Sequence, residues 1–471
     1  MSRETAKWRP HKAQSTNARP RDGPLRSSDE PSVMGGERRE WIIRLKTGTN
    51  PQGEESMDST KPFRISKHAV WKAYQQVKAN HGAAGVDGES IEAFEAQLKD
   101  NLYKLWNRLA SGSYFPPPVK VVAIAKKEGG QRMLGVPTVA DRIAQTVVKQ
   151  ALEPLVEPHF HRDSYGYRPG KSAHQALETT RQRCWRYAWV VKFDIKSAFD
   201  NLSHALMMKA VRHHTDCKWI LLYCERWLTA PVQYADGHQE VRTKGTAQGG
   251  VISPLLMNLV LHYVFDHWMQ RHYPQYPFER YADDGLAHCQ TETQALALKA
   301  ALVERFAACG LELHPTKTRI IYCKDDDRPG EYEHTKFDFL GYTFRARRSK
   351  NRWGKFFVNF TPAVSNDAGR AMRQKTRSWG LQDRSDKSLE DLSRMFNPLL
   401  RGWMTYYGRF YKSAMIPTLR HLNRVLVWWA MRKYKRLRRH KRRAEYWLGR
   451  IARKEPQLFA HWQMGVRPAA G

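Results

Sequence analysis

The sequence lacks the features of proteins that are held together by disulfides or zinc, or that span a membrane. Its 471 residues include 6 cysteines, and no two of them form a Cys-x-x-Cys pair, which excludes a zinc ribbon and a disulfide framework. The longest apolar stretch, residues 251–265, is interrupted by Ser253, Pro254, Asn258 and His262, so it predicts a buried core segment. No apolar run follows the basic N-terminus, so no signal peptide is predicted. These absences favour a reducing cytoplasm and no membrane partner.

Acidic residues are scarce relative to basic ones. The 46 Asp and Glu stand against 79 Lys and Arg, which gives a formal net charge of +33 and a pI near 10.0. A charge of this size favours a polyanionic partner, above all nucleic acid. A ribosomal-type basic protein would share the charge, but 16 Trp, 20 Tyr and 18 Phe are many for a purely electrostatic binder. The aromatic residues predict packed domains, with some rings available to stack on bases.

Two apolar segments carry aspartates in a pattern that predicts metal binding. Residues 281–284 read Tyr-Ala-Asp-Asp between short apolar runs, and residues 190–194 read Val-Val-Lys-Phe-Asp. Both are strand patterns, and each delivers a carboxylate to a strand end. Carboxylates gathered at one sheet edge can bind two Mg²⁺ ions, the arrangement that transfers nucleotidyl groups by in-line displacement. The three aspartates at 325–327 are interpreted instead as a solvated turn.

The order of the elements predicts an α+β fold. Residues 1–56 are rich in Arg, Ser, Pro and Gly without sustained periodicity, which predicts a disordered basic tail, and Met57 is an alternative start. Helical periodicity then covers residues 90–109, and a basic-tipped hairpin is expected from strands at 119–125 and 131–136. The strands that carry the aspartates alternate with helices near 203–215, 254–271 and 292–309. After about residue 363 the pattern becomes helical and increasingly basic.

The motifs of the chain, and the order in which they occur, resemble those of bacterial group II intron-encoded reverse transcriptases and maturases. The resemblance extends from about residue 63 to residue 464. It rests on the Tyr-Ala-Asp-Asp box, on Phe-Asp-Ile-Lys-Ser-Ala-Phe-Asp at 193–200, and on segments 82–88, 164–171, 310–318, 339–342 and 397–407. It implies a right-hand polymerase, with fingers and a palm built on an antiparallel sheet at 57–360. An all-helical thumb, or maturase domain, at 361–455 and a short C-terminal tail at 456–471 would follow.

The resemblance also implies a reaction and a set of site residues. The protein would be an RNA-directed DNA polymerase that uses an RNA template, a DNA primer and dNTPs. Asp194, Asp283 and Asp284 would bind two Mg²⁺ ions and form the catalytic triad, with the carbonyl of Ile195 as a further ligand. The residues expected to contact the incoming nucleotide are Lys126, Arg132, Phe199, Gln248, Gly249 and Lys317.

The C-terminal third predicts an RNA-binding surface. Residues 416–431 carry apolar side chains at helical spacing, and in residues 432–443 nine of twelve are Lys or Arg. Such charge density favours contact with a polyanion. By resemblance the partner is the intron RNA, whose splicing the protein would promote within a cytoplasmic ribonucleoprotein. The expected contacts are Arg432, Lys433, Lys435, Arg436, Arg438, Arg439, Lys441, Arg442 and Arg443.

The end of the chain refines the resemblance, and two other interpretations remain open. No cysteine follows Cys323, so the chain resembles the subgroup that lacks a zinc-associated endonuclease. One alternative is a reverse transcriptase of a retron, diversity-generating or phage-defence system, with no splicing role. The other is an RNA-binding splicing factor without catalytic activity. The segment at 397–407 argues against the first alternative, and the complete aspartate set argues against the second.

Overall fold

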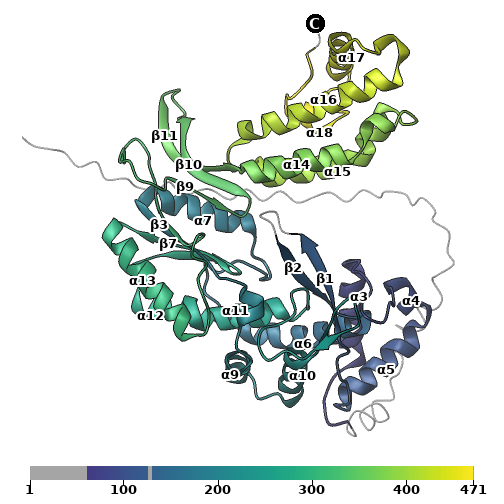
Figure 1. The fold of residues 1–471 in the computed structure, drawn as a ribbon, viewed down its shortest axis with the longest axis vertical. Coiled ribbons are helices and arrows are strands. Elements are labelled where there is room, and N and C mark those ends of the chain that lie inside the picture. Colours follow the sequence, from purple (N-terminus) through teal and green to yellow (C-terminus); the bar gives the residue numbers. More distant parts are fainter. Residues whose placement is uncertain (1–60, 126–129, 470–471) are drawn as a thin grey trace, which may run out of the picture. The chain divides into compact units, whose positions relative to one another are not determined.

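The computed structural model describes residues 61–125 and 130–469, which belong to one compact unit (Figure 1). The expected tail at 1–56, the alternative start at Met57 and Lys126, which was expected to contact the nucleotide, lie outside the described residues. Within the described ranges, no helix has the length and apolar character needed to cross a bilayer. The described part is mixed α and β, and it ends in a helical region.

A four-stranded antiparallel sheet lies at the centre of the part that carries the aspartates. Its strand order is β6-β7-β3-β8, with β6 Phe278–Tyr281, β7 Asp284–Cys289, β3 Trp189–Asp194 and β8 Arg319–Tyr322. Side chains alternate between the two faces of each strand. One face packs on α13 (Glu292–Ala308), where the ring of Phe193 lies 5.6 Å from that of Phe306. Gly285 leaves room for this ring, because a Cβ there would lie 2.1 Å from it.

The other face of this sheet packs against a helix and a second sheet. Helix α7 (Ala173–Arg186) and the three-stranded sheet β11-β10-β9 share one apolar core with Val190, Leu286 and Ile321. The three strands are β9 Lys336–Phe339, β10 Tyr342–Lys350 and β11 Phe356–Val364. Leu340 and Gly341 connect β9 to β10, and both have positive φ, 50° and 78°. That pair of conformations is typical of a two-residue hairpin turn.

A third sheet and a group of helices make up the N-terminal half. The sheet has the order β2-β1-β4-β5. Its strands are β1 Val119–Ala125, β2 Gln131–Val136, β4 Val232–Gln233 and β5 Gln239–Glu240. The helices are α3 Lys67–Ala79, α4 Ile91–Ala96, α5 Leu98–Ala110, α6 Val139–Val156, α8 Ala198–Asn201, α9 His204–His214, α10 Lys218–Thr229, α11 Ser253–Leu261 and α12 His267–His272. The hairpin β1–β2 matches the sequence prediction.

The chain after β11 is helical. Its main helices are α14 Asn366–Ser378, α15 Leu389–Tyr407, α16 Ile416–Lys433, α17 Lys441–Lys454 and α18 Ala460–Gln463. Buried aromatic and aliphatic side chains hold them together, with Trp429 and Trp462 fully buried. Residues 456–469, assigned above to a tail, contribute α18 to this core. Asn397 fixes that segment, because its amide donates to the carbonyl of Leu458 and its side-chain oxygen accepts from the backbone N–H of Ala460, both at 2.9 Å.

Three local expectations differ from the structure. The single helix expected at 90–109 is two helices, because Gln97 leaves the helical conformation (φ −123°, ψ 40°). The helix expected at 254–271 contains one wide turn, His262–Asp266, between α11 and α12. The turn at 325–327 is only partly solvated, since Arg328 forms an ion pair with Asp325, whose side chain is 12% exposed. In each case a tertiary contact or a local backbone change overrides the sequence pattern.

Candidate functional site

The carboxylates predicted to bind metal come together at one end of the central sheet. Asp194 and Asp284 are register partners at the ends of β3 and β7. Directly opposite residues of an antiparallel pair project from the same face, with Cβ atoms about 4.5–5.5 Å apart. Asp283 precedes Asp284 in the two-residue turn that joins β6 to β7. Two strands and one turn therefore supply all three side chains.

A buried ion pair holds that turn in an unusual conformation. Ala282 has a φ of 58°, in the left-handed region that residues with a Cβ seldom adopt. Arg280, which is fully buried, donates to the carbonyl of Ala282 at 3.0 Å. The same guanidinium binds both carboxylate oxygens of Asp266, at 2.7 and 2.6 Å, and the amide oxygen of Asn258 at 2.9 Å. One side chain thus connects the turn to the helical layer beneath the sheet.

The segment at 164–171 packs against the back of the same turn. The N–H of Tyr165 donates to the carbonyl of Arg280 at 2.8 Å, and the amide of Asn258 donates to the carbonyl of Gly166 at 2.6 Å. A Cβ on Gly166 would lie 2.4 Å from the backbone nitrogen of Ala282. Glycine is required here because backbone touches backbone.

Two lysines form ion pairs with the carboxylates. The Nζ of Lys192 lies 2.9 Å from Oδ1 of Asp284, and the Nζ of Lys317 lies 3.7 Å from Oδ2 of Asp194. Lys192 precedes Asp194 by two residues on β3, so it projects from the same face. The segment that carries Lys317 is placed by backbone pairing, because Ile195 bridges Leu313 and the N–H of His314 donates to the carbonyl of Asp194 at 2.8 Å.

The electrostatics of the three carboxylates fit a divalent cation. Burial, together with the negative charges of Asp194 and Asp284, raises the pKa of Asp283. Burial also raises the pKa of Asp284, against the opposing effect of Lys192. Within residues 61–125 and 130–469, no three His, Cys, Asp or Glu side chains are gathered as a metal-binding group. The donor chemistry nevertheless fits, since carboxylate oxygens are what Mg²⁺ prefers. A cation would also offset the repulsion from Asp194 and Asp284, which adds to burial in raising the pKa of Asp283.

The hairpin β1–β2 brings a cation to the same site. The Nε of Arg132 donates to the side-chain oxygen of Gln248 at 2.6 Å, and the amide of Gln248 donates to Asp200 at 3.1 Å. The positive charge of Arg132 also acts on Asp283, whose pKa it lowers against the larger effect of burial. The backbone N–H of Gly135 donates to the carbonyl of Gln248 at 2.8 Å. Arg132 and Gln248 are therefore held as a pair.

Close backbone packing shapes the loop that carries Gln248. Gly249 has a φ of 125°, and a Cβ there would lie 2.2 Å from the carbonyl oxygen of Gly135. Gly245, at φ 75°, leaves no room for a Cβ beside the carbonyl oxygens of Phe199 and Asp200. Phe199 is 7% exposed, and its carbonyl accepts from the N–H of Thr246 at 2.7 Å. The loop thus lies against both the β1–β2 hairpin and the segment that follows Asp194.

Sequence reasoning missed Lys192 and Arg280. Side chains alternate between the two faces of a strand, so a lysine two positions before a strand-end aspartate lies on the same face as the aspartate. This alternation could have identified Lys192. Arg280 and its neighbour Glu279 are fully buried charges in a four-residue strand. Buried arginine is rare unless it is paired, but the partner, Asp266, lies on a different element, so no sequence signal identifies the pair.

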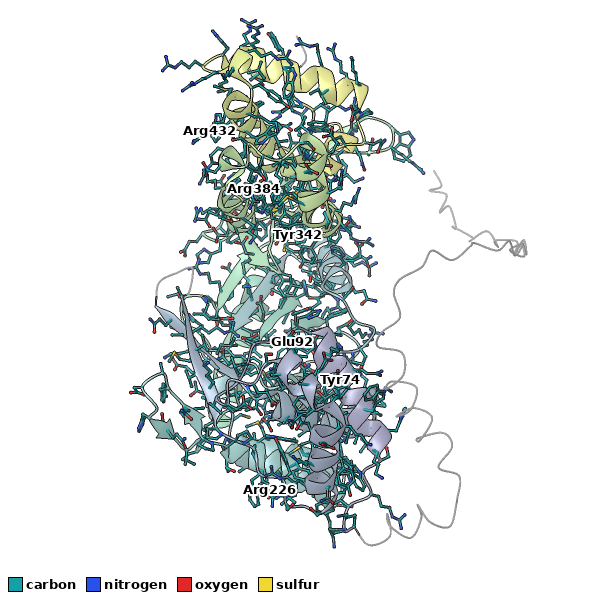
Figure 2. All side chains as sticks on the ribbon, turned by 90° about the vertical axis from the view of Figure 1, so that its right-hand side faces the viewer. Tyr74, Glu92, Arg226, Tyr342, Arg384 and Arg432 are labelled. Carbon is teal, nitrogen blue, oxygen red and sulfur yellow. The ribbon has the colours of Figure 1, made fainter. Side chains whose placement is uncertain are left out.

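The basic run at 432–443 lies on the surface of the helical region. Its first residue, Arg432, is labelled in Figure 2. Eight of its nine Lys and Arg are exposed, while Lys433 is half-buried. Lys433 donates to the carbonyls of Ser385 and Lys387, at 2.9 and 2.7 Å, so it holds the fold together locally. The other members are Arg432, Lys435, Arg436, Arg438, Arg439, Lys441, Arg442 and Arg443. A short 3-10 turn, Lys435–Leu437, separates α16 from α17 and divides the run.

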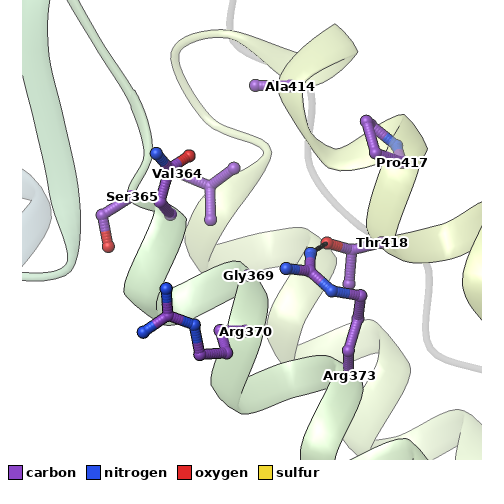
Figure 3. Close-up of a pocket in the computed structure, with 9 residues that line it drawn as sticks. Val364, Ser365, Gly369, Arg370, Arg373, Ala414, Pro417 and Thr418 are labelled. Atoms are coloured by element: carbon purple, nitrogen blue, oxygen red, sulfur yellow. Dashed lines mark hydrogen bonds between the residues drawn. The ribbon is translucent and has the colours of Figure 1, made fainter.

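A cavity of about 280 Å³ lies where β11 leads into α14 (Figure 3). Arg370 and Arg373 line it, and Arg373 donates to the hydroxyl of Thr418 at 3.3 Å. Gly369 keeps this contact open, since a Cβ there would lie 3.2 Å from the guanidinium of Arg373. The cavity adds two guanidinium groups to the cationic surface of the helical region.

Comparison with known proteins gives two family matches. Residues 124–344 match the family described as reverse transcriptase (RNA-dependent DNA polymerase), and residues 370–447 match the maturase-specific domain of group II introns. Protein YkfC of Escherichia coli is 39% identical over 362 residues, which cover 67% of this chain and 90% of that protein. The group II intron-encoded protein LtrA of Lactococcus lactis is 34% identical over 225 residues, which cover 47% of this chain and 37% of LtrA.

Among solved structures, telomerase from Candida albicans aligns with a TM-score of 0.42 and 13% identity, over 80% of this chain and 68% of that one. The aspartates, strand β2 and the last two residues of β1 fall within the first family match, and the basic run falls within the second. The chain therefore belongs to the family of group II intron reverse transcriptases and maturases, and it is an RNA-directed DNA polymerase with a maturase-specific domain.

Proposed function

We propose that the protein extends a DNA primer along an RNA template at Asp194, Asp283 and Asp284, and promotes splicing of an intron RNA through its helical C-terminal region. The observation that carries the first activity is the register of β3 and β7. It pairs Asp194 with Asp284 beside the turn that carries Asp283. Carboxylates gathered in this way can hold the pair of metal ions that nucleotidyl transfer by in-line displacement uses.

The three aspartates and the carbonyl of Ile195 would hold two Mg²⁺ ions. When bound, the ions neutralise charge on the triphosphate and make the 3′-oxygen of the primer a better nucleophile. Lys192 favours the ionised form of Asp284, because its ammonium group lowers the pKa of that carboxyl against burial. The ionised carboxylate is the form that binds a cation. Lys317 places a second positive charge beside Asp194, where it can contact a phosphate.

Arg132 and Gln248 would orient the incoming nucleotide. Their hydrogen bond at 2.6 Å uses the Nε of Arg132, so it does not occupy the terminal nitrogens of the guanidinium. A planar guanidinium matches phosphate oxygens in a bidentate manner. Gly249 allows backbone to approach a ligand closely, and Phe199 would pack against the ribose. Lys126, in the same hairpin, would add a further cation.

The intron RNA would bind the exposed cations of residues 432–443. The eight exposed Lys and Arg lie on a region with a packed apolar core, so they can contact phosphates without unfolding it. Binding would stabilise the folded intron, and the RNA itself would supply the splicing chemistry. Because all six cysteines are free thiols, we place the resulting ribonucleoprotein in a reducing cytoplasm.

The test is primer extension on an RNA template with Mg²⁺. We expect Asp283→Asn to lower the rate by on the order of 10³-fold or more, because it removes charge at the reacting centre. Asp327→Asn makes the same chemical change in an exposed turn and should leave the rate unchanged. If the wild type extends no primer, the polymerase proposal is wrong.

Splicing of an intron RNA at low Mg²⁺ measures the second activity. Asp283→Asn should keep this activity, because the exposed cations of residues 432–443 are unchanged. Loss of splicing together with synthesis would show that the two roles share one site. An active polymerase that never promotes splicing would favour the retron-like alternative.

A further inference from the structure

The hairpin formed by β10 and β11 carries a cationic segment that neither family match includes. The matches end at residue 344 and resume at residue 370. Between them, residues 345–355 contain six Lys and Arg, and residues 339–366 contain no Asp or Glu. No ion pair to any of these six cations occurs in the described part of the chain. Within the described residues, these six cations therefore remain available to an acidic ligand.

The tip of this hairpin has a defined turn. The N–H of Asn351 donates to the carbonyl of Lys355 at 2.9 Å, and the N–H of Gly354 donates to the carbonyl of Asn351 at 3.0 Å. The side-chain oxygen of Asn351 accepts from the N–H groups of Trp353 and Lys355, at 3.0 and 2.9 Å. Gly354 has a φ of 86°, which this turn requires. Trp353 is thus held in a fixed turn while 75% of its surface is exposed.

One face of the hairpin changes from core to surface along its length. At the root, Phe344 and Phe360 are fully buried. Further along the same face lie Arg348 and Phe356, and Phe356 is 53% exposed. The guanidinium of Arg348 lies 3.9 Å from the centre of the Phe356 ring. The aromatic face therefore continues past the core as a surface of rings and cations.

The other cations of the tip lie beside aromatic rings as well. The guanidinium of Arg352 lies 4.1 Å from the centre of the Trp353 ring, and Lys350 lies 5.6 Å from that of Phe356. A cation over a ring orients the charge and leaves its hydrogen-bond donors free for another acceptor. Such pairs present a base-stacking plane and a phosphate contact side by side.

The body of the hairpin is anchored to the helical region. Arg347 donates to the carbonyl of Thr361 at 3.1 Å, and its guanidinium lies 5.6 Å from the centre of the Tyr411 ring. The hydroxyl of Tyr411 donates to the carbonyl of Arg348 at 3.3 Å. The tip is therefore presented by a braced strand pair, so binding a ligand there needs little ordering of the chain.

We propose that the hairpin tip, residues 348–356, binds a single-stranded segment of RNA. Trp353 and Phe356 would stack on unpaired bases, and Arg348, Lys350, Arg352 and Lys355 would contact the phosphates around them. A duplex would offer phosphates but no free base faces, so it would leave the exposed rings unused. An acidic polypeptide would likewise satisfy only the cations. The choice of RNA over DNA rests on the proposed function, in which RNA is both template and splicing partner.

The experiment compares two triple variants that lose equal charge and one exposed ring. The hairpin variant is Arg348→Gln, Arg352→Gln, Trp353→Ser. The control is Lys99→Gln, Lys104→Gln, Tyr103→Ser, on exposed positions of α5. The full chain is titrated with an unstructured polyuridylate RNA at several salt concentrations. We expect the hairpin variant to lose roughly 10-fold or more in affinity, with the salt slope reduced by about 1.4 for two lost phosphate contacts on a single strand.

Cross-linking locates the contact on the chain. RNA that contains 5-iodouridine should cross-link to Trp353 under ultraviolet light, and Trp353→Phe, which keeps a ring, should retain affinity close to wild type. Equal losses in the hairpin and control variants would overturn the proposal. The proposal would also be overturned if the hairpin variant lost as much affinity, or more, for single-stranded DNA, duplex RNA or polyglutamate as it loses for single-stranded RNA. Primer extension by the wild type is scored separately, so a failure of the polymerase proposal is distinguishable from a failure here.

Discussion

The central sheet and the helical C-terminal region handle charge in opposite ways. Around the sheet, charges are buried and paired: Arg280 binds Asp266, and Arg183 binds both Glu279 and Asp163, at 2.6 Å each. In the helical region the core is aromatic and aliphatic, and the cations lie outside it. Buried ion pairs are held in one geometry, whereas exposed Lys and Arg side chains can adapt to ligands of different geometry. The sheet is thus suited to fix reacting atoms, and the helical region to hold a long polyanion.

The buried polar side chains described in the helical region carry hydroxyls, amides and imidazoles rather than ions. The side-chain oxygen of Asn423 accepts from His461 and from the indole N–H of Trp462, at 2.6 and 2.9 Å. Its amide donates to the carbonyl of Val466 at 3.1 Å. Neutral hydrogen bonds attach the last segment to α16 without the large desolvation cost of a buried ion. The two regions can therefore be perturbed separately.

Among the variants that test the contrast between the two regions, Arg280→Lys is expected to have the largest effect, on the rate of primer extension. Lysine keeps the charge but cannot bind both oxygens of Asp266 and also the carbonyl of Ala282. The turn that carries Asp283 would lose its support, so we expect the maximal rate of primer extension to fall roughly 10–100-fold, as for other residues that orient metal ligands. The affinities for primer–template and for intron RNA should stay the same.

The matched control for this change is Arg212→Lys, in a pair with Glu225 whose side chains are about half exposed. Exposed pairs contribute little to stability, so this variant should behave as wild type. Measuring kcat and KM for dNTP, with the melting temperature as a fold check, separates positioning from general damage. A raised KM with unchanged kcat would show that Arg280 does not act through the turn.

The second effect is expected in the helical region. Arg436→Gln, Arg438→Gln and Arg439→Gln remove three exposed cations from the basic run. Because phosphate contacts release counterions, the logarithmic salt slope of intron RNA binding should fall by roughly 0.9 for each contact made to a duplex. Synthesis on a short template should be unaffected. If DNA synthesis fell by the same factor as the affinity for intron RNA, the two regions would not have separate roles.

How much of this the sequence predicts depends on whether a feature is local. Several features follow from periodicity and turn chemistry. They are the strand that ends at Asp194, the hairpin that carries Asp283, the β1–β2 hairpin and the amphipathic helix after residue 416. The Arg280–Asp266 pair does not follow from them, because its partners meet only through tertiary packing. The hydrogen bonds that Lys433 donates to backbone carbonyls and the burial of Trp462 also depend on tertiary packing, so the sequence does not predict them. Sequence identifies which residues carry charge, while packing decides which of them are free to bind.

The smallest effect concerns the stability of the helical region against acid. Burial lowers the pKa of His461 to about 3, so the folded protein keeps this imidazole neutral, whereas the unfolded chain protonates it below about 6.5. As pH falls from about 6.5 towards 3, the unfolded state binds the extra proton, so the free energy of unfolding falls by up to about 1.4 kcal/mol per pH unit.

The variant His461→Asn removes the imidazole and with it this pH dependence. We expect the free energy of unfolding, measured with denaturant at pH 7 and pH 5, to change less with pH in the variant than in the wild type. Equal pH dependence in both would show that His461 is not the group that titrates, and that the neutral bonds around Asn423 do not govern how the helical region responds to acid.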